Sequence, residues 1–265
     1  MPFDQSGEIR YLTFDSFKLN GIVHAAFTRR GGLSPDPWAA LNVGGLVGDA
    51  PDRVAENRRR SFHALGRDPA SMYDVWQVHG IEVVCADAPR DLVKPHLKAD
   101  AILTDKPGVT LFMRFADCVP ILLFDPYHRV VGLVHAGWLG TVRRVALSAL
   151  EVMHSQYGSR MKDICAAIGP SICANHYEVG PEVADQVERA FGEQAYLLLS
   201  RDHRCNTVKF KFDLWAANRL ILEQAGLEQI ETSGICTACN PEDWYSHRGE
   251  KGKTGRFGVL IGLKD

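Results

Sequence analysis

The sequence predicts an α+β fold with mixed β-sheets in a single domain. Strand-like segments outnumber helix-like ones and do not alternate regularly with them, unlike a doubly wound parallel sheet. Several neighbouring strand-like runs are separated only by turn-type residues, as in hairpins. No internal repeat, low-complexity tract or linker divides the 265 residues, so we expect one domain over residues 1–265.

Seven apolar runs predict the strands. Each is short and is bounded by turn-type or polar residues. In chain order they cover residues 82–87, 100–104, 108–115, 119–124, 130–135, 163–169 and 256–263.

Four segments predict helices, and each of them ends at a glycine. Pro51 lies in the first turn of the first segment, and Asp213 is placed to cap the N-terminus of the last. The four helices cover residues 51–66, 141–158, 180–192 and 213–226.

The formal net charge of −2 gives no reason to expect nucleic acid or an anionic membrane as a partner. The basic cluster Arg58, Arg59 and Arg60 follows Glu56 in a predicted helix and is typical of a solvated helix face. The near-neutral charge and the lack of a coiled-coil pattern favour a monomer or small oligomer.

The chain carries no pattern of a secreted or membrane protein. We find no secretory signal, and the apolar runs are far shorter than the roughly 20 residues of a membrane helix. Seven cysteines are an odd number with irregular spacing. This favours a reducing, cytoplasmic location in which a particular cysteine serves a metal or catalysis.

The segment ADCVPILLFDPYHRVVGLVHAGWLG, residues 116–140, is the most informative part of the sequence. Its two apolar runs flank a turn-type cluster around Pro126. If the hairpin is centred between Pro126 and Tyr127, Cys118 and His135 lie directly opposite each other, with Cβ atoms roughly 5 Å apart. A thiolate and an imidazole so placed can share a metal ion, or act as a nucleophile and its base.

His79, in DVWQVHG, is the best candidate for a third ligand, because it too lies between a short apolar run and a glycine. A His-Cys-His set with an open fourth position is the pattern of a catalytic zinc. The alternative is that His79 and His135 are buried histidines with satisfied hydrogen bonds and that Cys118 is a small buried apolar residue.

Three glycine-containing loops are candidates for anion contacts. In AGWLGT, Gly137 and Gly140 precede a predicted helix, where free backbone N–H groups bind anions. The segment TRRGG offers Arg29, and the loop of residues 244–258 offers arginines for phosphate or carboxylate. A tight turn and a solvated loop are the alternatives for the first two. The basic residues of the third loop are His247, Arg248 and Arg256.

The segment CTAC, residues 236–239, is a lone CxxC motif. No helix begins there and no second CxxC motif exists, so redox and zinc-knuckle roles lack their usual context. We do not expect an independent site at this segment.

Two enzyme classes follow from the residues alone. One is a metal-dependent enzyme that activates water or phosphate, and the other is a cysteine hydrolase with Cys118 as nucleophile and His135 as base. A His₂Cys set near Met113 also matches a blue-copper pattern, but the ten histidines include no His-x-His pair, which argues against a copper oxidase. A non-enzymatic binding or regulatory module with a relic site is a further alternative.

The segments WQVHG, ADAILTD, FADCVPILL and VHAGWLG resemble the laccase-domain, or polyphenol-oxidoreductase, family. The likeness continues through FTRRGGLS, LNVG…GD, ENRRR, GPSI…YEVG and CT…SHR…GR, in order, over nearly the whole chain. Its members are understood as zinc-dependent purine nucleoside phosphorylases, and the older name reflects reported copper-dependent oxidation of phenols. The resemblance implies a single compact domain of α/β layers, with mixed sheets flanked by helices.

The resemblance also implies a catalytic Zn²⁺, with Cu²⁺ as the alternative metal, held by His79, Cys118 and His135. Asp117 would orient these ligands, since metal-bound histidines usually need a partner. The implied reaction is phosphorolysis of adenosine, inosine or 5′-methylthioadenosine to the free base and (methylthio)ribose 1-phosphate, with adenosine deaminase activity on the side. The partners are then a purine nucleoside and phosphate.

Further roles fall on matching positions. Arg29, Arg248 and the amides around Gly137 would meet the charge of phosphate. Asn42 and Gln77 are candidates for contacts to the ribose or the base.

The chain departs from the family at Leu139 in HAGWLG, where a basic residue is common. Arg143 and Arg144, one turn later, are candidates to compensate. The alternative is a shifted substrate preference.

Overall fold

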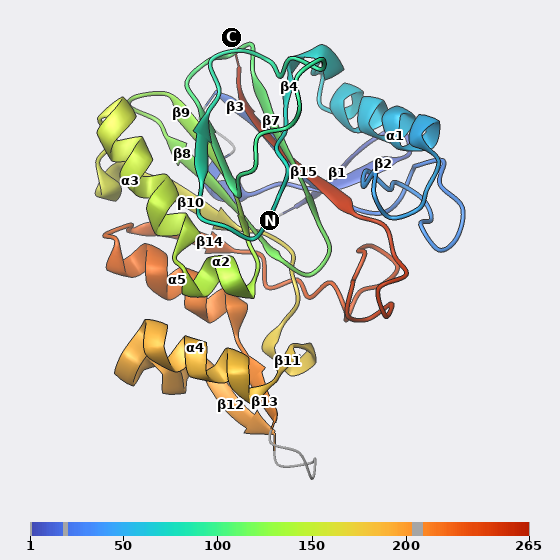
Figure 1. Ribbon diagram of the computed structural model, residues 1–265. Helices are drawn as coiled ribbons and strands as arrows, with labels where there is room; N and C mark the ends of the chain where they lie inside the picture. Colours follow the sequence, from blue (N-terminus) through green and yellow to red (C-terminus); the bar gives the residue numbers. More distant parts are fainter. Residues whose placement is uncertain (1, 18–20, 203–208, 265) are drawn as a thin grey trace.

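The computed structural model describes residues 2–17, 21–202 and 209–264. Two six-stranded sheets pack face to face, and helices cover the outer face of each sheet (Figure 1). Each sheet contains both parallel and antiparallel strand pairs. The predicted α+β fold with mixed sheets is therefore confirmed. Within the described ranges, no helix has the length and apolar character needed to cross a membrane.

The first sheet has the strand order β1-β2-β3-β15-β7-β4. Helix α1 (Pro51–Ala64) covers its outer face, where Phe62 packs with Phe112 and Leu260. The neighbouring residues Met113 and Ile261 point to the opposite face and pack against the second sheet, as the alternation of side chains along a strand requires. The strands are β1 (Phe3–Ser6), β2 (Ile9–Leu12), β3 (Ile22–Phe27), β4 (Met72–Tyr73), β7 (Thr110–Phe115) and β15 (Phe257–Leu263).

The second sheet has the order β14-β10-β8-β9-β6-β5. Helices α3 (Val145–Tyr157) and α5 (Leu214–Gln224) cover its outer face, with Leu123 and Ala149 in the shared core. Leu122 and Phe124 face the first sheet. The strands are β5 (Val83–Cys85), β6 (Ala101–Thr104), β8 (Val119–Asp125), β9 (Val130–Ala136), β10 (Cys165–Ile168) and β14 (Gln229–Thr232).

A small third sheet, of order β11-β13-β12, lies with helix α4 (Pro181–Phe191) at one end of the molecule (Figure 1). Its strands are β11 (Glu178–Val179), β12 (Leu199–Asp202) and β13 (Lys209–Phe212). Short 3₁₀ helices connect the larger elements. They are η1 (Asp15–Phe17), η2 (Pro69–Ser71), η3 (Met161–Asp163), η4 (Ala174–His176) and η5 (Gly192–Leu197).

Two features of the secondary structure differ from the predictions. The single helix over residues 141–158 is wrong: α2 (Trp138–Val142) and α3 are separate, because Arg144 has a φ of 63° and a left-handed residue cannot continue a helix. The strands between residues 3 and 27, the strands β4 and β14, and those of the third sheet were not predicted. All of these except β3 have four residues or fewer, and β1 is exposed along its whole length, so they lack the apolar alternation that marks a buried strand. The longer β3 is mostly buried, but its polar His24 interrupts the apolar run.

The β8–β9 hairpin has a different register from the predicted one. Pro120 pairs with His135, so the prediction that Cys118 lies directly opposite His135 is wrong by two residues. The turn is displaced because Asp125 Oδ1 accepts hydrogen bonds from the backbone N–H groups of Tyr127 (2.8 Å) and His128 (3.1 Å). A shift of two residues keeps every side chain on its face, so Cys118 and His135 remain diagonal neighbours on one side of the sheet.

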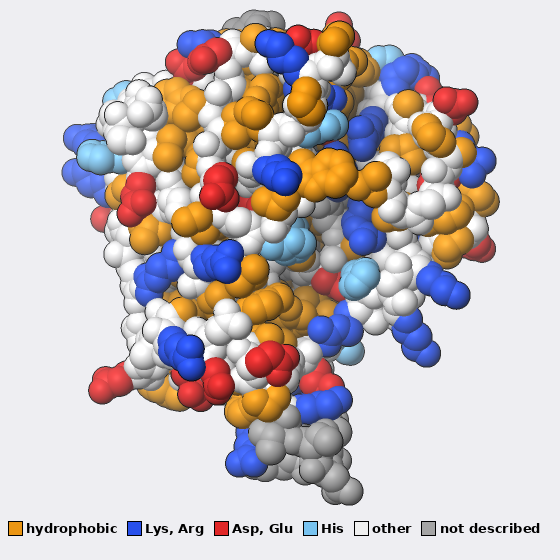
Figure 2. Space-filling model, viewed as in Figure 1, with side chains coloured by type: hydrophobic (Ala, Val, Ile, Leu, Met, Phe, Trp, Pro, Cys, Tyr) orange, Lys and Arg blue, Asp and Glu red, His pale blue; other side chains and the backbone are white. Residues whose placement is uncertain are grey.

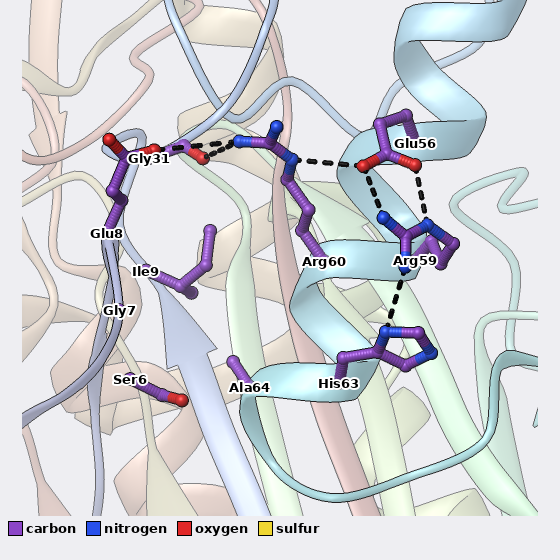
Figure 3. Close-up of a pocket in the computed structure, with 10 residues that line it drawn as sticks. All are labelled: Ser6, Gly7, Glu8, Ile9, Gly31, Glu56, Arg59, Arg60, His63 and Ala64. Carbon is purple, nitrogen blue, oxygen red and sulfur yellow. Dashed lines mark hydrogen bonds and ion pairs between the residues drawn. The ribbon is translucent and has the colours of Figure 1, made fainter.

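The basic cluster in α1 is only partly a solvated face. Arg59 Nε lies 2.6 Å from Glu56 Oε2, and Arg60 Nε lies 3.1 Å from Glu56 Oε1, as expected of such a face (Figure 3). Arg58 differs, because its Nε and Nη2 donate to the carbonyl oxygen of Val43 and its side chain lines a cavity. The prediction was wrong for Arg58.

Buried His24 is expected to make the stability of the fold depend on pH. Its Nε2 accepts the backbone N–H of Phe14 at 2.8 Å, and burial lowers its pKa from 6.5 to about 4, although Glu231 opposes the shift. Below pH 6.5 the imidazole of His24 binds a proton in the unfolded chain, whereas in the folded state it does so only near pH 4. Stability is therefore full above pH 6.5 and falls by about 3 kcal/mol as the pH approaches 4.

The His24→Gln variant retains an acceptor for Phe14 and removes this titration. Urea unfolding at neutral pH and near pH 4 should give a smaller loss of stability in the variant than in the wild type. An equal loss in both proteins would assign the acid sensitivity to other groups.

Candidate metal centre

His79, Cys118 and His135 come together at one end of the two large sheets. Cys118 immediately precedes β8, His135 lies near the end of β9, and His79 lies in the loop between β4 and β5. One potential ligand atom from each lies within 4.8 Å of the other two. Cys118 Sγ is 3.8 Å from His79 Nε2, and the two imidazole centroids are 4.9 Å apart.

These three donors fit a divalent metal such as zinc. With bonds of about 2.3 Å to sulfur and about 2.0 Å to nitrogen, a tetrahedral Zn²⁺ places S and N atoms about 3.5 Å apart. The observed 3.8 Å between Cys118 Sγ and His79 Nε2 lies close to this value. Because His79 is exposed and the described residues supply three converging donors, a fourth position is open to a ligand.

Asp100 holds both histidines in place. Its Oδ1 is 2.8 Å from His135 Nδ1, which leaves the Nε2 atom of His135 as the potential ligand. Its Oδ2 accepts the backbone N–H groups of Val78 (3.1 Å) and Gly80 (2.6 Å), which flank His79. Asp100 is fully buried at the start of an apolar strand. That placement is the one sequence signal that points to it, and we did not single it out as a site residue.

Asp117 has a different role from the predicted one. Its Oδ1 accepts from Thr237 Oγ1 at 2.6 Å and its Oδ2 from the backbone N–H of Arg248 at 2.6 Å, whereas the histidine partner is Asp100. The backbone at Asp117 has a φ of 81°, and the backbone at His79 has a φ of 59°. Left-handed backbone at non-glycine residues is strained, so the hydrogen bonds of Asp117 hold the turn that presents Cys118.

The electrostatics of the centre favour an ionised pair. Burial by itself raises the pKa of Cys118, but the charges and hydrogen bonds of His135 and His79 together outweigh it and lower that pKa to about 6. Burial lowers the pKa of His135, but the Cys118 thiolate and Asp100 raise it to about 9. A thiolate is the form that binds a metal or attacks an electrophile. His79 adds a second nitrogen beside the sulfur, which a metal centre uses and a simple Cys-His pair does not require.

Two cavities meet at this centre, and His79 and Cys118 line both of them. The larger has a volume of about 550 Å³ and the smaller about 320 Å³. Histidine and basic side chains gather around a hollow in the middle of the face shown in Figure 2, in keeping with the composition of the larger cavity. The basic side chains that line it are Arg58, His96, Arg114, His247 and Arg256.

The larger cavity is cationic. Arg114 is paired with Asp74 at 2.9 Å. Arg58 and Arg256 donate to backbone carbonyl groups, and within the described part of the chain neither forms an ion pair with a carboxylate. Burial and the like charge of Arg114 lower the pKa of Arg58 to about 10, and burial lowers the pKa of Arg256. Two half-buried guanidinium groups that form no ion pair with a carboxylate in the described ranges make this cavity suitable for an anion.

The smaller cavity is apolar and aromatic. Leu139 lines it, at the position where the resembled family commonly has a basic residue. Arg144 does not compensate, because its Nη2 donates to the carbonyl oxygen of Ala190 and its guanidinium lies over the ring of Phe191. The apolar and aromatic residues that line the cavity are Val78, Trp138, Leu139, Ile172, Tyr177 and Leu214.

Gly137 lines the smaller cavity and lies against the side chains of His79 and Cys118. A Cβ atom there would be 2.7 Å from His79 Cδ2 and 3.1 Å from Cys118 Sγ, so only glycine leaves room for both side chains. Arg248 is not among the residues that line either cavity. Its Nη1 donates to the carbonyl of Glu178 at 2.7 Å, and its guanidinium lies 5.1 Å from the ring centroid of Tyr177, which lines the smaller cavity.

The side chains of the other predicted contact residues, Arg29, Asn42 and Gln77, form contacts within the protein. Arg29 pairs with Glu250 at 3.0 Å and stacks over Tyr245, outside the residues that line either cavity. Asn42 is fully buried, and its Oδ1 accepts the backbone N–H of Arg256 at 2.9 Å. Gln77 lines the larger cavity, where its amide bonds the backbone of Arg114 in both directions.

Residues 23–264 match the family model described as multi-copper polyphenol oxidoreductase laccase. The chain is 42% identical over 243 residues to a purine nucleoside phosphorylase of Deinococcus radiodurans, covering 91% of this chain and 89% of the relative. It is 38% identical over 255 residues to the purine nucleoside phosphorylase YlmD of Bacillus subtilis, covering 93% and 90%.

Solved structures share the fold. The hypothetical protein YfiH of Bacillus licheniformis superposes with a TM-score of 0.90 at 32% identity, over 99% of both chains. YlmD from Geobacillus stearothermophilus gives a TM-score of 0.89 at 32% identity, also over 99% of both chains.

Proposed function

The chain belongs to the multi-copper polyphenol oxidoreductase laccase family, and we propose that it acts as a zinc-dependent purine nucleoside phosphorylase. The proposed substrates are phosphate and adenosine, inosine or 5′-methylthioadenosine. The products are the free base and (methylthio)ribose 1-phosphate, and adenosine deamination is a proposed side activity of the same centre. The main observation that supports this proposal is a His-Cys-His group of potential ligand atoms between a cationic cavity and an apolar cavity.

His79, Cys118 and His135 would hold the metal in this proposal. When bound, the metal supplies Lewis-acid polarisation of a phosphate oxygen or of a water molecule. Asp100 keeps the proton of His135 on Nδ1 and thereby leaves Nε2 free for coordination. The open side of the centre faces both cavities, so both substrates can reach it.

The cationic cavity is the proposed phosphate site. Arg58 and Arg256 would meet the negative charge, with Arg248 and the backbone around Gly137 nearer the smaller cavity. A phosphate oxygen would form the new bond to C1′ as the glycosidic C–N bond breaks. The purine then leaves with the bonding electron pair and takes up one proton.

The apolar cavity is the proposed site of the purine. Tyr177 and Trp138 offer aromatic surface for the base, and Leu139 adds apolar contact where a cation would favour phosphate. The ribose would then bridge the two cavities beside the metal ligands. In this proposal the base and the phosphate would lie on opposite sides of C1′.

Gly137→Ala should weaken the metal centre, because its Cβ would displace His79 or Cys118. We expect metal affinity and kcat to fall about 10- to 100-fold, as for other losses of ligand orientation. Metal content and adenosine phosphorolysis should be compared with Gly108→Ala, where a Cβ meets nothing within 4 Å. Equal metal content and activity in the two variants would contradict the close packing at Gly137.

The central test is turnover of adenosine with and without phosphate, before and after chelation, with the metal content measured alongside. Adenine released only with phosphate, lost on chelation and restored by Zn²⁺, would support the proposal. Inosine formed without phosphate would make deamination the main activity. A hydrolase based on Cys118 and His135 would keep its activity after chelation, and a copper oxidase would consume oxygen with phenols instead.

A further inference from the structure

Cys173, His176, Cys236 and Cys239 form a second group of potential ligands that the first centre does not use. Their donor atoms all lie within 4.8 Å of one another. The expectation that the CTAC segment stands alone was therefore wrong. Cys173 and His176 come from η4 and the residue before it, 63 positions earlier in the chain than Cys236 and Cys239.

The geometry of this group is that of one central ion. His176 Nδ1 lies 3.5 Å from Cys173 Sγ, 3.7 Å from Cys236 Sγ and 3.4 Å from Cys239 Sγ. A tetrahedral Zn²⁺ places sulfur and nitrogen ligands about 3.5 Å apart, which is close to each of these distances. Hydrogen bonding does not account for the arrangement, because one ring nitrogen donates or accepts along a single direction.

The surroundings orient these donors. The backbone N–H of Cys173 donates to Cys236 Sγ at 3.3 Å, and Asn240 Nδ2 donates to the carbonyl of Cys236 at 2.8 Å. Hydrogen bonds of this kind hold a ligand atom and its backbone in place around a metal. Cys236 is buried, whereas Cys239 and His176 are exposed, so an ion can enter from solvent.

We propose that Cys173, His176, Cys236 and Cys239 bind a structural Zn²⁺. A site of three cysteines and one histidine is closed, since no fourth position is left for water or substrate. On binding, the three thiol protons go to solvent and the imidazole coordinates in its neutral form, which leaves a net charge of −1 on the complex.

This ion would connect the two segments that support Asp117. Thr237, between the two cysteines of CTAC, donates its Oγ1 to Asp117 Oδ1 at 2.6 Å. Ile172, next to Cys173, donates its backbone N–H to the carbonyl of Asp117 at 3.0 Å. Asp117 precedes Cys118 and has left-handed backbone, so the second ion would stabilise the turn that presents a ligand of the first centre.

Metal content of the purified full chain tests the proposal. We expect two zinc ions per chain in the wild type, one in Cys239→Ser, and one in Cys118→Ser, which retains only the second site. Cys85→Ser is the matched control, because Cys85 is exposed and outside both groups, and it should keep two. Equal zinc content in Cys239→Ser and Cys85→Ser would overturn the proposal.

Thiol labelling of the wild type gives a readout that does not depend on any variant folding. With zinc bound, Cys173, Cys236 and Cys239 should resist alkylation, and they should react after chelation, whereas Cys85 should react equally in both states. Peptide mass spectrometry identifies each modified residue. Rapid labelling of Cys239 in the zinc-loaded protein, or a disulfide between Cys236 and Cys239 in it, would refute the site.

Discussion

Replacing Cys118 by serine is expected to remove the metal of the first centre and to lower kcat/KM for phosphorolysis by about 10³-fold or more. Lewis-acid stabilisation is worth several kcal/mol, and about 1.4 kcal/mol corresponds to a factor of ten in rate. A serine hydroxyl is nearly isosteric with the thiol but does not supply the thiolate that the low pKa of Cys118 provides. Zinc analysis and steady-state kinetics with adenosine and phosphate measure both effects.

The loss must be separated from misfolding and from a cysteine nucleophile. Cys118 immediately precedes β8 and is only partly buried, so thermal unfolding of the variant should stay close to that of the chelated wild type, which lacks the stabilisation by bound metal as well. Cys85→Ser serves again as the matched control. A nucleophilic role would give the same loss in Cys118→Ser but would leave the chelated wild type active, and that result would contradict the metal proposal.

Arg256→Met is expected to raise the KM for phosphate about 10- to 100-fold, with a smaller effect on the KM for the nucleoside. Hydrogen bonds to charged groups contribute about 1.5–3 kcal/mol, and Arg256 lines the cationic cavity without a carboxylate partner among the described residues. Methionine retains the length of the apolar stem, which packs closely beside Gly44. Initial rates at varied phosphate, with nucleoside held saturating, give the constant.

Arg219→Met is the control for loss of one positive charge. Arg219 pairs with Glu223 on the exposed side of α5, away from both cavities, so this change should leave both KM values unaltered. A selective rise in the KM for the nucleoside in Arg256→Met would instead assign the cationic cavity to that substrate. The two cavities would then exchange their proposed occupants.

The arrangement of Cys118 and His135 was accessible from the sequence because it depends on local pairing. Two apolar runs around a turn form a hairpin, and side chains alternate between its faces. The face on which a residue lies survives an error of two in the register, so both residues remained on the same side although Asp125 moved the turn. The helices predicted at residues 51–66 and 213–226 likewise depend on signals within their own segments. Asp213 caps the latter as expected.

The other features of the site depend on contacts between segments that are far apart in the chain. Hydrophobic periodicity gives no information on such contacts. The amino-acid sequence by itself determined the α+β class, the main strands and the proximity of Cys118 to His135. Only long-range pairing and packing placed Asp100 against His135 through the β6–β9 pair, turned Arg58 toward a cavity and brought Cys173 and His176 beside the CTAC segment. Periodicity reports which face of an element is buried, whereas the partner of a buried polar group is decided by tertiary packing.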